Sequence, residues 1–206
     1  MNKFPLISLA GAAVLALASV QAPAAQWTSA IERQGAAPAT WSDLEHTHWI
    51  ADGRDDAPRK VYVFMDANCK YCTKFWSDAR PWVRSGKVQL RHILVAVIAP
   101  TSAGKAATLL LDPDPARRFA SFEEAHAFGV VRMLADGTRH SLEDPNLKPM
   151  ESIPADVARS LEDHGSLMRS LGLRGTPGIV VRGLDGQLVA RPGIPREELP
   201  AILGAL

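Results

Sequence analysis

Apolar residues occur along the chain both in short continuous runs and at helical intervals. The run at residues 61–65 (Val-Tyr-Val-Phe-Met) has the composition and length of a buried strand. A second run at 88–98 predicts another strand, ended by Pro100. Two shorter runs at 178–182 and 187–191 flank Asp185-Gly186, a pair that favours a tight hairpin turn. The pattern therefore predicts at least four strands.

Most of the remaining apolar positions are spaced as in helices. A short helix is expected at 41–50, capped by Thr40 or Ser42, and another from 69 to about 76, kinked at Pro81 and ended by Gly86. Further helices are expected at 103–111, 116–128 and 156–171, and the last begins at Pro195. The order is β-α-β, three helices, then β-β-α. It predicts a small α/β sheet with a helical insertion at about 102–165.

The first residues have a different pattern from the rest. Lys3 is followed by an apolar run at 6–18, and small residues stand at Ala22 and Ala24. This is typical of a secretory signal peptide at 1–24, and the run is shorter than the ~20 apolar residues of a membrane span. We expect a loose tether at 25–40, a short linker helix and turn at 41–58, and the catalytic domain at 59–206. Export predicts an oxidising compartment, the bacterial periplasm.

Composition excludes several classes of protein. The 206 residues include 23 Lys and Arg and 22 Asp and Glu. The basic and acidic residues are nearly equal in number, which argues against a nucleic-acid partner. With 47% hydrophobic and 22% charged residues, the chain has ordinary globular values. Its 2 cysteines cannot form a disulfide-dense scaffold or a four-cysteine zinc site.

The two cysteines carry the candidate chemistry. Cys69 and Cys72 are three residues apart, directly after a predicted buried strand and at the start of a helix, which is typical of a redox dithiol. The helix N-terminus and the charge of Lys70 should both lower the pKa of Cys69, leaving Cys72 as the resolving thiol. Tyr71 completes the active-site loop. No cofactor is expected. The alternatives are a structural disulfide and a metal site, although no histidine has a ligand-like spacing from the cysteines.

Two further features lie close to this chemistry. Thr176-Pro177 precedes the third strand, where the proline could be cis and the backbone could pair with an extended substrate; the alternative is an ordinary trans turn. Asp66, three residues before Cys69, could relay a proton or could cap the strand-to-helix turn, and we favour the cap.

These residues, with their neighbours, closely resemble the catalytic domain of the DsbC/DsbG family of periplasmic disulfide isomerases. The matching segments are residues 56–58, 61–64, 69–72, 74–76, 79–83 and 85–91, and Thr176-Pro177 matches the Thr–cis-Pro loop of the family. The resemblance runs from about Trp41 to the C-terminus and is diffuse through the insertion. It implies a thioredoxin fold with a helical insertion between its βαβ and ββα halves. Position 63, where thioredoxins bury a carboxylate, holds Val63.

The resemblance also implies partners. It predicts a reductase or isomerase that acts on disulfides or sulfenylated cysteines of exported proteins and is kept reduced by a membrane donor of the DsbD type. The segment at 25–40 is too short for the dimerisation domain of the family, so a monomer is expected. Lys70 replaces the proline or glycine of the family, which should alter redox poise. The alternatives are a monomeric dithiol oxidase and a metal-handling or chaperone-like module of the same fold.

Overall fold

The computed structural model describes residues 1, 38–137, 147–183 and 185–206. The chain divides into two units, 1–37 and 38–206, and the second carries all the elements below. The signal peptide expected at 1–24 and the tether up to residue 37 lie outside the described residues, as does most of the polar loop before Pro149.

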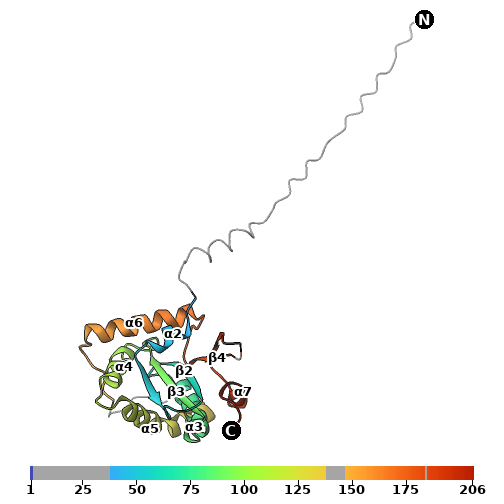
Figure 1. Ribbon diagram of the computed structural model, residues 1–206. Coiled ribbons are helices and arrows are strands. Elements are labelled where there is room, and N and C mark those ends of the chain that lie inside the picture. The colour runs from blue at the N-terminus through green and yellow to red at the C-terminus, as the bar shows by residue number, and fades with distance from the viewer. Residues whose placement is uncertain (2–37, 138–146, 184) are drawn as a thin grey trace. The chain divides into compact units, whose positions relative to one another are not determined.

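A five-stranded mixed sheet forms the centre of the second unit (Figure 1). The strands are β1 (Trp49–Asp52), β2 (Arg59–Met65), β3 (Val88–Leu94), β4 (Gly178–Arg182) and β5 (Leu188–Pro192), in the order β1-β3-β2-β4-β5. Strands β2 and β3 are parallel, and the other neighbours are antiparallel. Strand β2 lies in the middle of the sheet because both of its faces are apolar, and such a strand must be covered on both sides.

Helices cover both faces of the sheet (Figure 1). They are α2 (Trp41–Glu45), α3 (Lys70–Arg84), α4 (Ser102–Leu110), α5 (Pro115–Asp136), α6 (Ala155–Ser170) and α7 (Leu199–Leu203), with a 3-10 turn at Arg196–Glu198. Alternate residues of β2 divide between two cores: Val61 and Val63 pack with α3, α4, α5 and α7, and Tyr62 packs with α2 and α6. None of the helices in the described ranges is long and apolar enough to cross a membrane.

The prediction of a helix at 41–50 is wrong in its second half. Thr40 caps α2 through a reciprocal capping box with Asp43, and the helix ends at Glu45. Residues Trp49–Asp52 then form the edge strand β1, paired antiparallel with β3. An edge strand is stabilised by its partner rather than by local propensity, so pairing with β3 decides the structure here.

Two other predicted boundaries also differ from the structure. Strand β3 ends at Leu94 rather than near residue 98, because the backbone N–H groups of Val97 and Ile98 donate to the Asp66 carboxylate instead of to a neighbouring strand. Helix α5 continues beyond 128 to Asp136. Gly129 does not end it, since Val130 and Met133 are buried on the same helix and the packing outweighs the cost of one glycine, about 1 kcal/mol.

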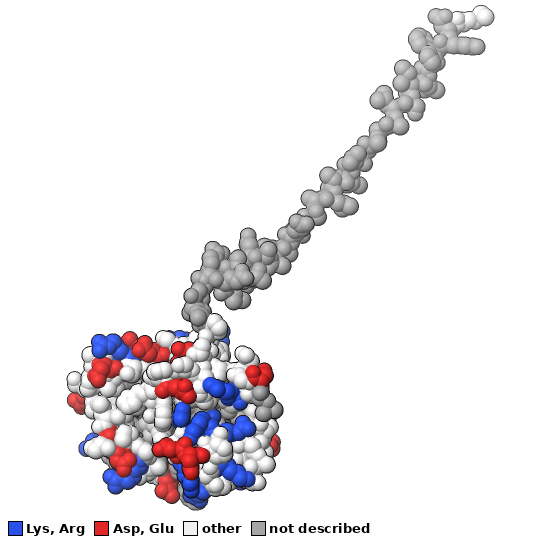
Figure 2. Space-filling view, in the orientation of Figure 1, with Lys and Arg blue, Asp and Glu red and all other residues white. Residues whose placement is uncertain are grey.

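Basic and acidic side chains are interspersed over the face of the second unit that Figure 2 shows. This distribution matches the nearly balanced charge of the whole sequence, 23 basic against 22 acidic residues.

Candidate active site

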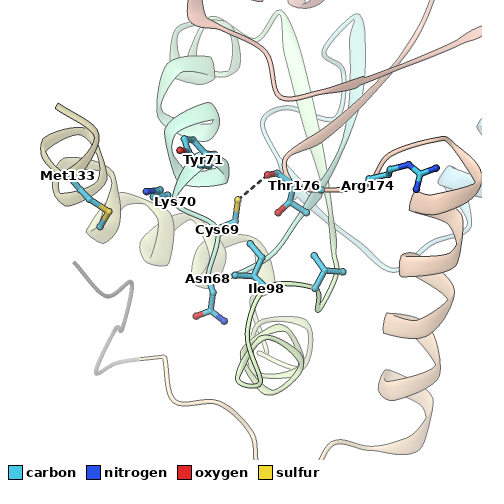
Figure 3. Close-up of a pocket in the computed structure, with 10 residues that line it drawn as sticks. Asn68, Cys69, Lys70, Tyr71, Ile98, Met133, Arg174 and Thr176 are labelled. Carbon is cyan, nitrogen blue, oxygen red and sulfur yellow. Dashed lines mark hydrogen bonds between the residues drawn. The ribbon is translucent and has the colours of Figure 1, made fainter. Parts of the chain in front are cut away.

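Cys69 is the N-cap residue of α3, at the point where the chain leaves β2 and turns into the helix. Its Sγ accepts a hydrogen bond from the backbone N–H of Cys72 at 3.2 Å. The same thiol donates to the carbonyl oxygen of Thr176 at 3.3 Å, as the dashed line in Figure 3 shows. Both cysteines are free thiols and both are buried. The helix start and the Thr176-Pro177 loop therefore meet at Cys69.

The two thiols have opposite pKa shifts. The hydrogen bond with the Cys72 side chain is the largest cause that lowers the pKa of Cys69, to about 7; burial opposes it, while Thr176 and the backbone N–H groups at the helix start add to it. Burial, followed by the neighbouring Cys69, raises the pKa of Cys72 well above its ordinary value. Near neutral pH Cys69 is thus the more readily ionised thiol, and Cys72 keeps its proton.

The largest effects on the pKa of Cys69 come from hydrogen bonds and burial, and the expected effect of the Lys70 charge stays a prediction. The Lys70 ammonium lies 5.2 Å from the centre of the Tyr71 ring, and Figure 3 shows the side chain pointing away from the sulfur. The helix N-terminus acts on Cys69 through hydrogen bonds made by the backbone N–H groups of Tyr71 and Cys72.

Asp66 is almost completely buried, with 1% of its surface exposed. One carboxylate oxygen accepts from the backbone N–H of Asn68 and from the Ser102 hydroxyl, both at 2.8 Å. The other accepts from the backbone N–H groups of Val97 at 2.7 Å and Ile98 at 3.0 Å. Four donors bind this carboxylate, which therefore holds two loops together, as the favoured structural role predicts.

The Thr176-Pro177 peptide bond is cis, and it leads directly into β4. A hollow of about 520 Å³ lies beside Cys69 and Thr176, with exposed Val97 and Ile98 on one side. Its charged lining residues are basic, namely Lys70 and Arg174.

A second hollow of about 520 Å³ includes Pro177, Phe75 and Ile194. Tyr71, with 56% of its surface exposed, and Thr176 line both hollows. We call the two hollows together the groove; Cys69 lines its first part, and Val97, Ile98 and Tyr71 form an apolar wall there.

The sequence interpretation missed Glu123, a buried acid on α5 with 1% of its surface exposed. Burial raises its pKa to about 8, although a hydrogen bond with the Thr73 side chain opposes the shift. A signal for it was present: Glu123 is four residues after Phe119 and four before Ala127, and both of these face the core. Sequence reasoning also missed the contributions of Met133 and Arg174 to the groove.

Within the described residues, no group of three or more His, Cys, Asp or Glu side chains is arranged to hold a metal ion.

Comparisons with known proteins show what the chain is similar to. Thiol:disulfide interchange protein DsbG of Pseudomonas aeruginosa is 42% identical over 165 residues, which are 80% of this chain and 58% of the relative. DsbG of Escherichia coli is 38% identical over 178 residues, 84% of this chain and 65% of the relative. The chain is DsbG-like. It spans less than two thirds of the length of either relative.

The expected thioredoxin fold is confirmed by comparison with solved structures. A thioredoxin-like oxidoreductase from Silicibacter pomeroyi superposes with a TM-score of 0.53, covering 79% of the DsbG-like chain and 95% of its own. Its sequence identity is 20%, so this likeness bears on the fold alone. No family model matches the chain.

Proposed function

We propose that the chain is a periplasmic thiol–disulfide oxidoreductase, a reductase or isomerase of disulfides or sulfenylated cysteines in exported proteins. The observation that carries the proposal is the contrast between two adjacent thiols beside a cis-proline loop. The pKa of Cys69 is lowered to about 7, and that of Cys72 is raised well above the ordinary value. The similarity to DsbG proteins supports the same activity and the same compartment.

In the proposed reaction, the Cys69 thiolate attacks one sulfur of a substrate disulfide, and the other sulfur leaves as a thiolate. Cys72 then attacks the Cys69 sulfur of the mixed disulfide, which releases the substrate cysteine and forms the Cys69–Cys72 disulfide. The substrate gains two electrons, which a membrane donor of the DsbD type restores to the dithiol. If a second substrate thiol displaces Cys69 before Cys72 does, the outcome is isomerisation.

A sulfenylated cysteine follows the same route. The Cys69 thiolate attacks the sulfur of the sulfenic acid, the oxygen leaves as water after taking up a proton, and the mixed disulfide is the same as before. Resolution by Cys72 then returns the substrate cysteine to a thiol.

The groove supports binding of an extended substrate segment. The Thr176-Pro177 loop borders both hollows, so a chain lying along it passes the reactive sulfur. The apolar wall of Val97, Ile98 and Tyr71 suits an apolar residue near the substrate cysteine. Lys70 and Arg174 favour an acidic residue in the first hollow.

We further propose that the unit at 38–206 is monomeric. Three of the large exposed apolar side chains of the described part line the groove at Cys69: Tyr71, Val97 and Ile98. Others lie in different parts of the chain: Leu111 directly after α4, Phe128 on α5 and Val189 on β5. Single exposed apolar residues are normal on monomers and do not form a stable interface.

The Cys72→Ala variant tests the proposed function. This variant retains the nucleophile but cannot resolve the mixed disulfide, so it should accumulate mixed disulfides with exported proteins, visible after acid quenching, alkylation and non-reducing electrophoresis. Cys69→Ala, the matched control, should trap none.

The redox state of the native pair in the same cells separates the alternatives. A mostly reduced pair is expected of a reductase or isomerase, and a mostly oxidised pair would favour the oxidase. Absence of trapped substrates together with no exchange activity in the purified protein would contradict the proposal and favour a non-catalytic module.

A further inference from the structure

A third hollow continues the groove beyond its apolar wall. It has a volume of about 370 Å³, and helix α6 contributes Glu162 and Arg169 to its lining. Val97 lines both this hollow and the first one, which contains Cys69. The second hollow adjoins the first on the side of Pro177 and shares no lining residue with the third. The three hollows therefore lie in a row with the Cys69 sulfur beside the middle one, and we call this row the extended groove.

Basic side chains predominate along the extended groove. Five basic residues line it against two acidic ones. The basic residues are Lys70, Lys74, Arg169, Arg174 and Arg196, and the acidic residues are Asp78 and Glu162. Lys74 forms an ion pair with Asp78, so these two charges cancel each other. The whole sequence is nearly balanced, with 23 basic and 22 acidic residues, and the basic excess is therefore local to the extended groove.

The other four basic side chains have no acid to pair with. The Lys70 ammonium lies over an aromatic ring, and Arg169 donates to the hydroxyl of Ser166 at 3.0 Å. Within the part of the chain that the structure describes, no carboxylate pairs with Arg174 or Arg196. The three arginines are exposed, so they are not needed to neutralise a buried charge of the fold. Their charges remain available to a bound molecule.

The four charges lie on both sides of the sulfur. In Figure 3, the side chains of Lys70 and Arg174 lie to either side of Cys69. Farther out, Arg169 lines the third hollow and Arg196 lines the second. An extended segment that lies along the extended groove with its cysteine at Cys69 therefore meets basic side chains both before and after that cysteine.

We propose that the extended groove selects exported segments in which acidic residues stand on both sides of the reacting cysteine. The inference rests on the proposed function and adds to it a class of substrate. The selection acts mainly on encounter, because opposite charges raise association rates whereas a single exposed ion pair adds little affinity. Glu162, the one unpaired acid among the described lining residues, opposes this selection at one end of the extended groove.

Peptides of equal length with a single cysteine test the selection. The cysteine of each peptide is blocked as a mixed disulfide with pyridinethiol. Cys69 attacks the peptide sulfur, and the pyridine sulfur leaves with the electron pair of the broken bond, takes up a proton and becomes a neutral thione that absorbs light. Cys72 then forms the disulfide with Cys69 and releases the reduced peptide. One peptide has glutamates on both sides of the cysteine, a second has glutamines at the same positions, and a third has glutamates on one side only.

The parent protein should react with the two-sided acidic peptide roughly tenfold faster than with the glutamine peptide at low salt. The one-sided peptide should have an intermediate rate. The advantage should shrink as the ionic strength rises above ~0.1 M, because the charges are exposed and salt screens them. The readout is the ratio of the two rates for one protein, since a change in the fraction of Cys69 thiolate affects both peptides equally.

The combined change Arg169→Gln, Arg174→Gln and Arg196→Gln removes three of the four charges. The ratio should fall to about threefold or less, because only Lys70 remains. Arg159→Gln is the matched control: it removes the same charge from an exposed residue of α6 that lines none of the three hollows, and it should keep the ratio of the parent.

Glu162→Gln changes the charge of the extended groove in the opposite direction. It removes the acid that opposes the selection, so the ratio should rise above that of the parent. A loss of folded protein or of reactive thiolate would not raise this ratio, and the variant therefore separates selection by charge from a general structural effect.

Equal rates for the acidic and glutamine peptides in the parent would overturn the inference. A ratio like that of the parent in the triple variant would overturn it as well, as would a one-sided peptide that reacts as fast as the two-sided one. An equal fall of the ratio in Arg159→Gln would assign the preference to overall charge instead of to the extended groove. If the parent yields no reduced peptide from any of the mixed disulfides, the proposed function fails instead, and the two failures are therefore distinguishable.

Discussion

At the scale of single residues, Thr176 acts on the dithiol in two ways. Its carbonyl oxygen accepts a hydrogen bond from Cys69 at 3.3 Å. Its hydroxyl oxygen is buried and has no hydrogen-bond partner among the described residues, so it is free to donate to a thiolate, and the side chain lowers the pKa of both thiols. A hydroxyl group stabilises a thiolate because it can donate to the charged sulfur. A side chain of the cis-proline loop is therefore part of the electrostatics of the redox centre.

Thr176→Val keeps the shape of the side chain and removes the hydroxyl. The pKa of Cys69 should rise from about 7 by roughly half a unit to one unit, so that less thiolate is present at neutral pH. Titration of the ultraviolet absorbance of the thiolate against pH measures the shift. Asp56→Asn, the control, changes a solvent-exposed carboxylate that pairs with Arg54 and should leave the titration unchanged. A Thr176→Val curve that coincides with the parent curve would contradict the assignment.

The sequence identifies some of these residues better than others. Cys69, Cys72, Thr176 and Pro177 are recognisable because their roles are tied to local spacing and to the start of an element. Glu123 is not, since its position against Thr73 depends on how α5 packs on α3. The conformations of long side chains cannot be predicted from the sequence either.

At the scale of elements, a buried ion pair joins the edge strand β1 to helix α3 and strand β3. Asp52 of β1 accepts two bonds from Arg80 of α3, and His92 of β3 lies 3.1 Å from the same carboxylate. Burial opposes ionisation, but the bonds from His92 and Arg80 outweigh it and hold the pKa of Asp52 far below its usual range. The edge strand is thus fixed to two neighbouring elements through one side chain.

Asp52→Asn should destabilise the protein by about 3–5 kcal/mol, because it leaves the Arg80 charge buried without its partner. Urea unfolding at neutral pH measures the difference. Asp56→Asn removes a carboxylate that pairs with Arg54 in solvent, both side chains being 68% exposed, and should leave the unfolding midpoint unchanged. Equal midpoints for Asp52→Asn and the parent would show that this ion pair does not hold β1 in place.

The role of Asp52 also shows why the segment at 41–52 was hard to interpret. The tryptophans and the isoleucine of this segment are compatible with either a helix or a strand. A strand, unlike a helix, needs a neighbouring strand to pair with. Of the two caps expected from the sequence, Thr40 and Ser42, Thr40 is the one that marks where the helix begins. Where it ends depends on β3 and Arg80, which come later in the chain.

At the scale of the whole molecule, the order of elements was predictable and their lateral arrangement was less so. Hydrophobic runs and Asp185-Gly186 locate the four strands β2 to β5, and the helices of the insertion follow from apolar spacing. The fifth strand, β1, was missed because only its pairing with β3 defines it. Long-range pairing of this kind is absent from local sequence patterns.

Self-association tests the whole-molecule proposal. The purified protein, with residues 38–206 intact, should be a monomer by light scattering at micromolar concentration, because its exposed apolar side chains do not build an interface of the ~2,000 Å² typical of obligate dimers. It should reduce disulfides or sulfenic acids but refold a scrambled multi-disulfide ribonuclease poorly. A stable dimer with strong isomerase activity would contradict this proposal and leave the proposed redox chemistry intact.

The four hydrogen bonds to the Asp66 carboxylate have a consequence for the thermodynamics of substrate binding. They hold the backbone at Asn68, Val97 and Ile98, so that the apolar wall of the groove has its shape before any substrate arrives. The conformational entropy of this loop is therefore lost during folding. A substrate that meets an already ordered wall retains more of its contact energy as affinity, since binding does not have to order the loop.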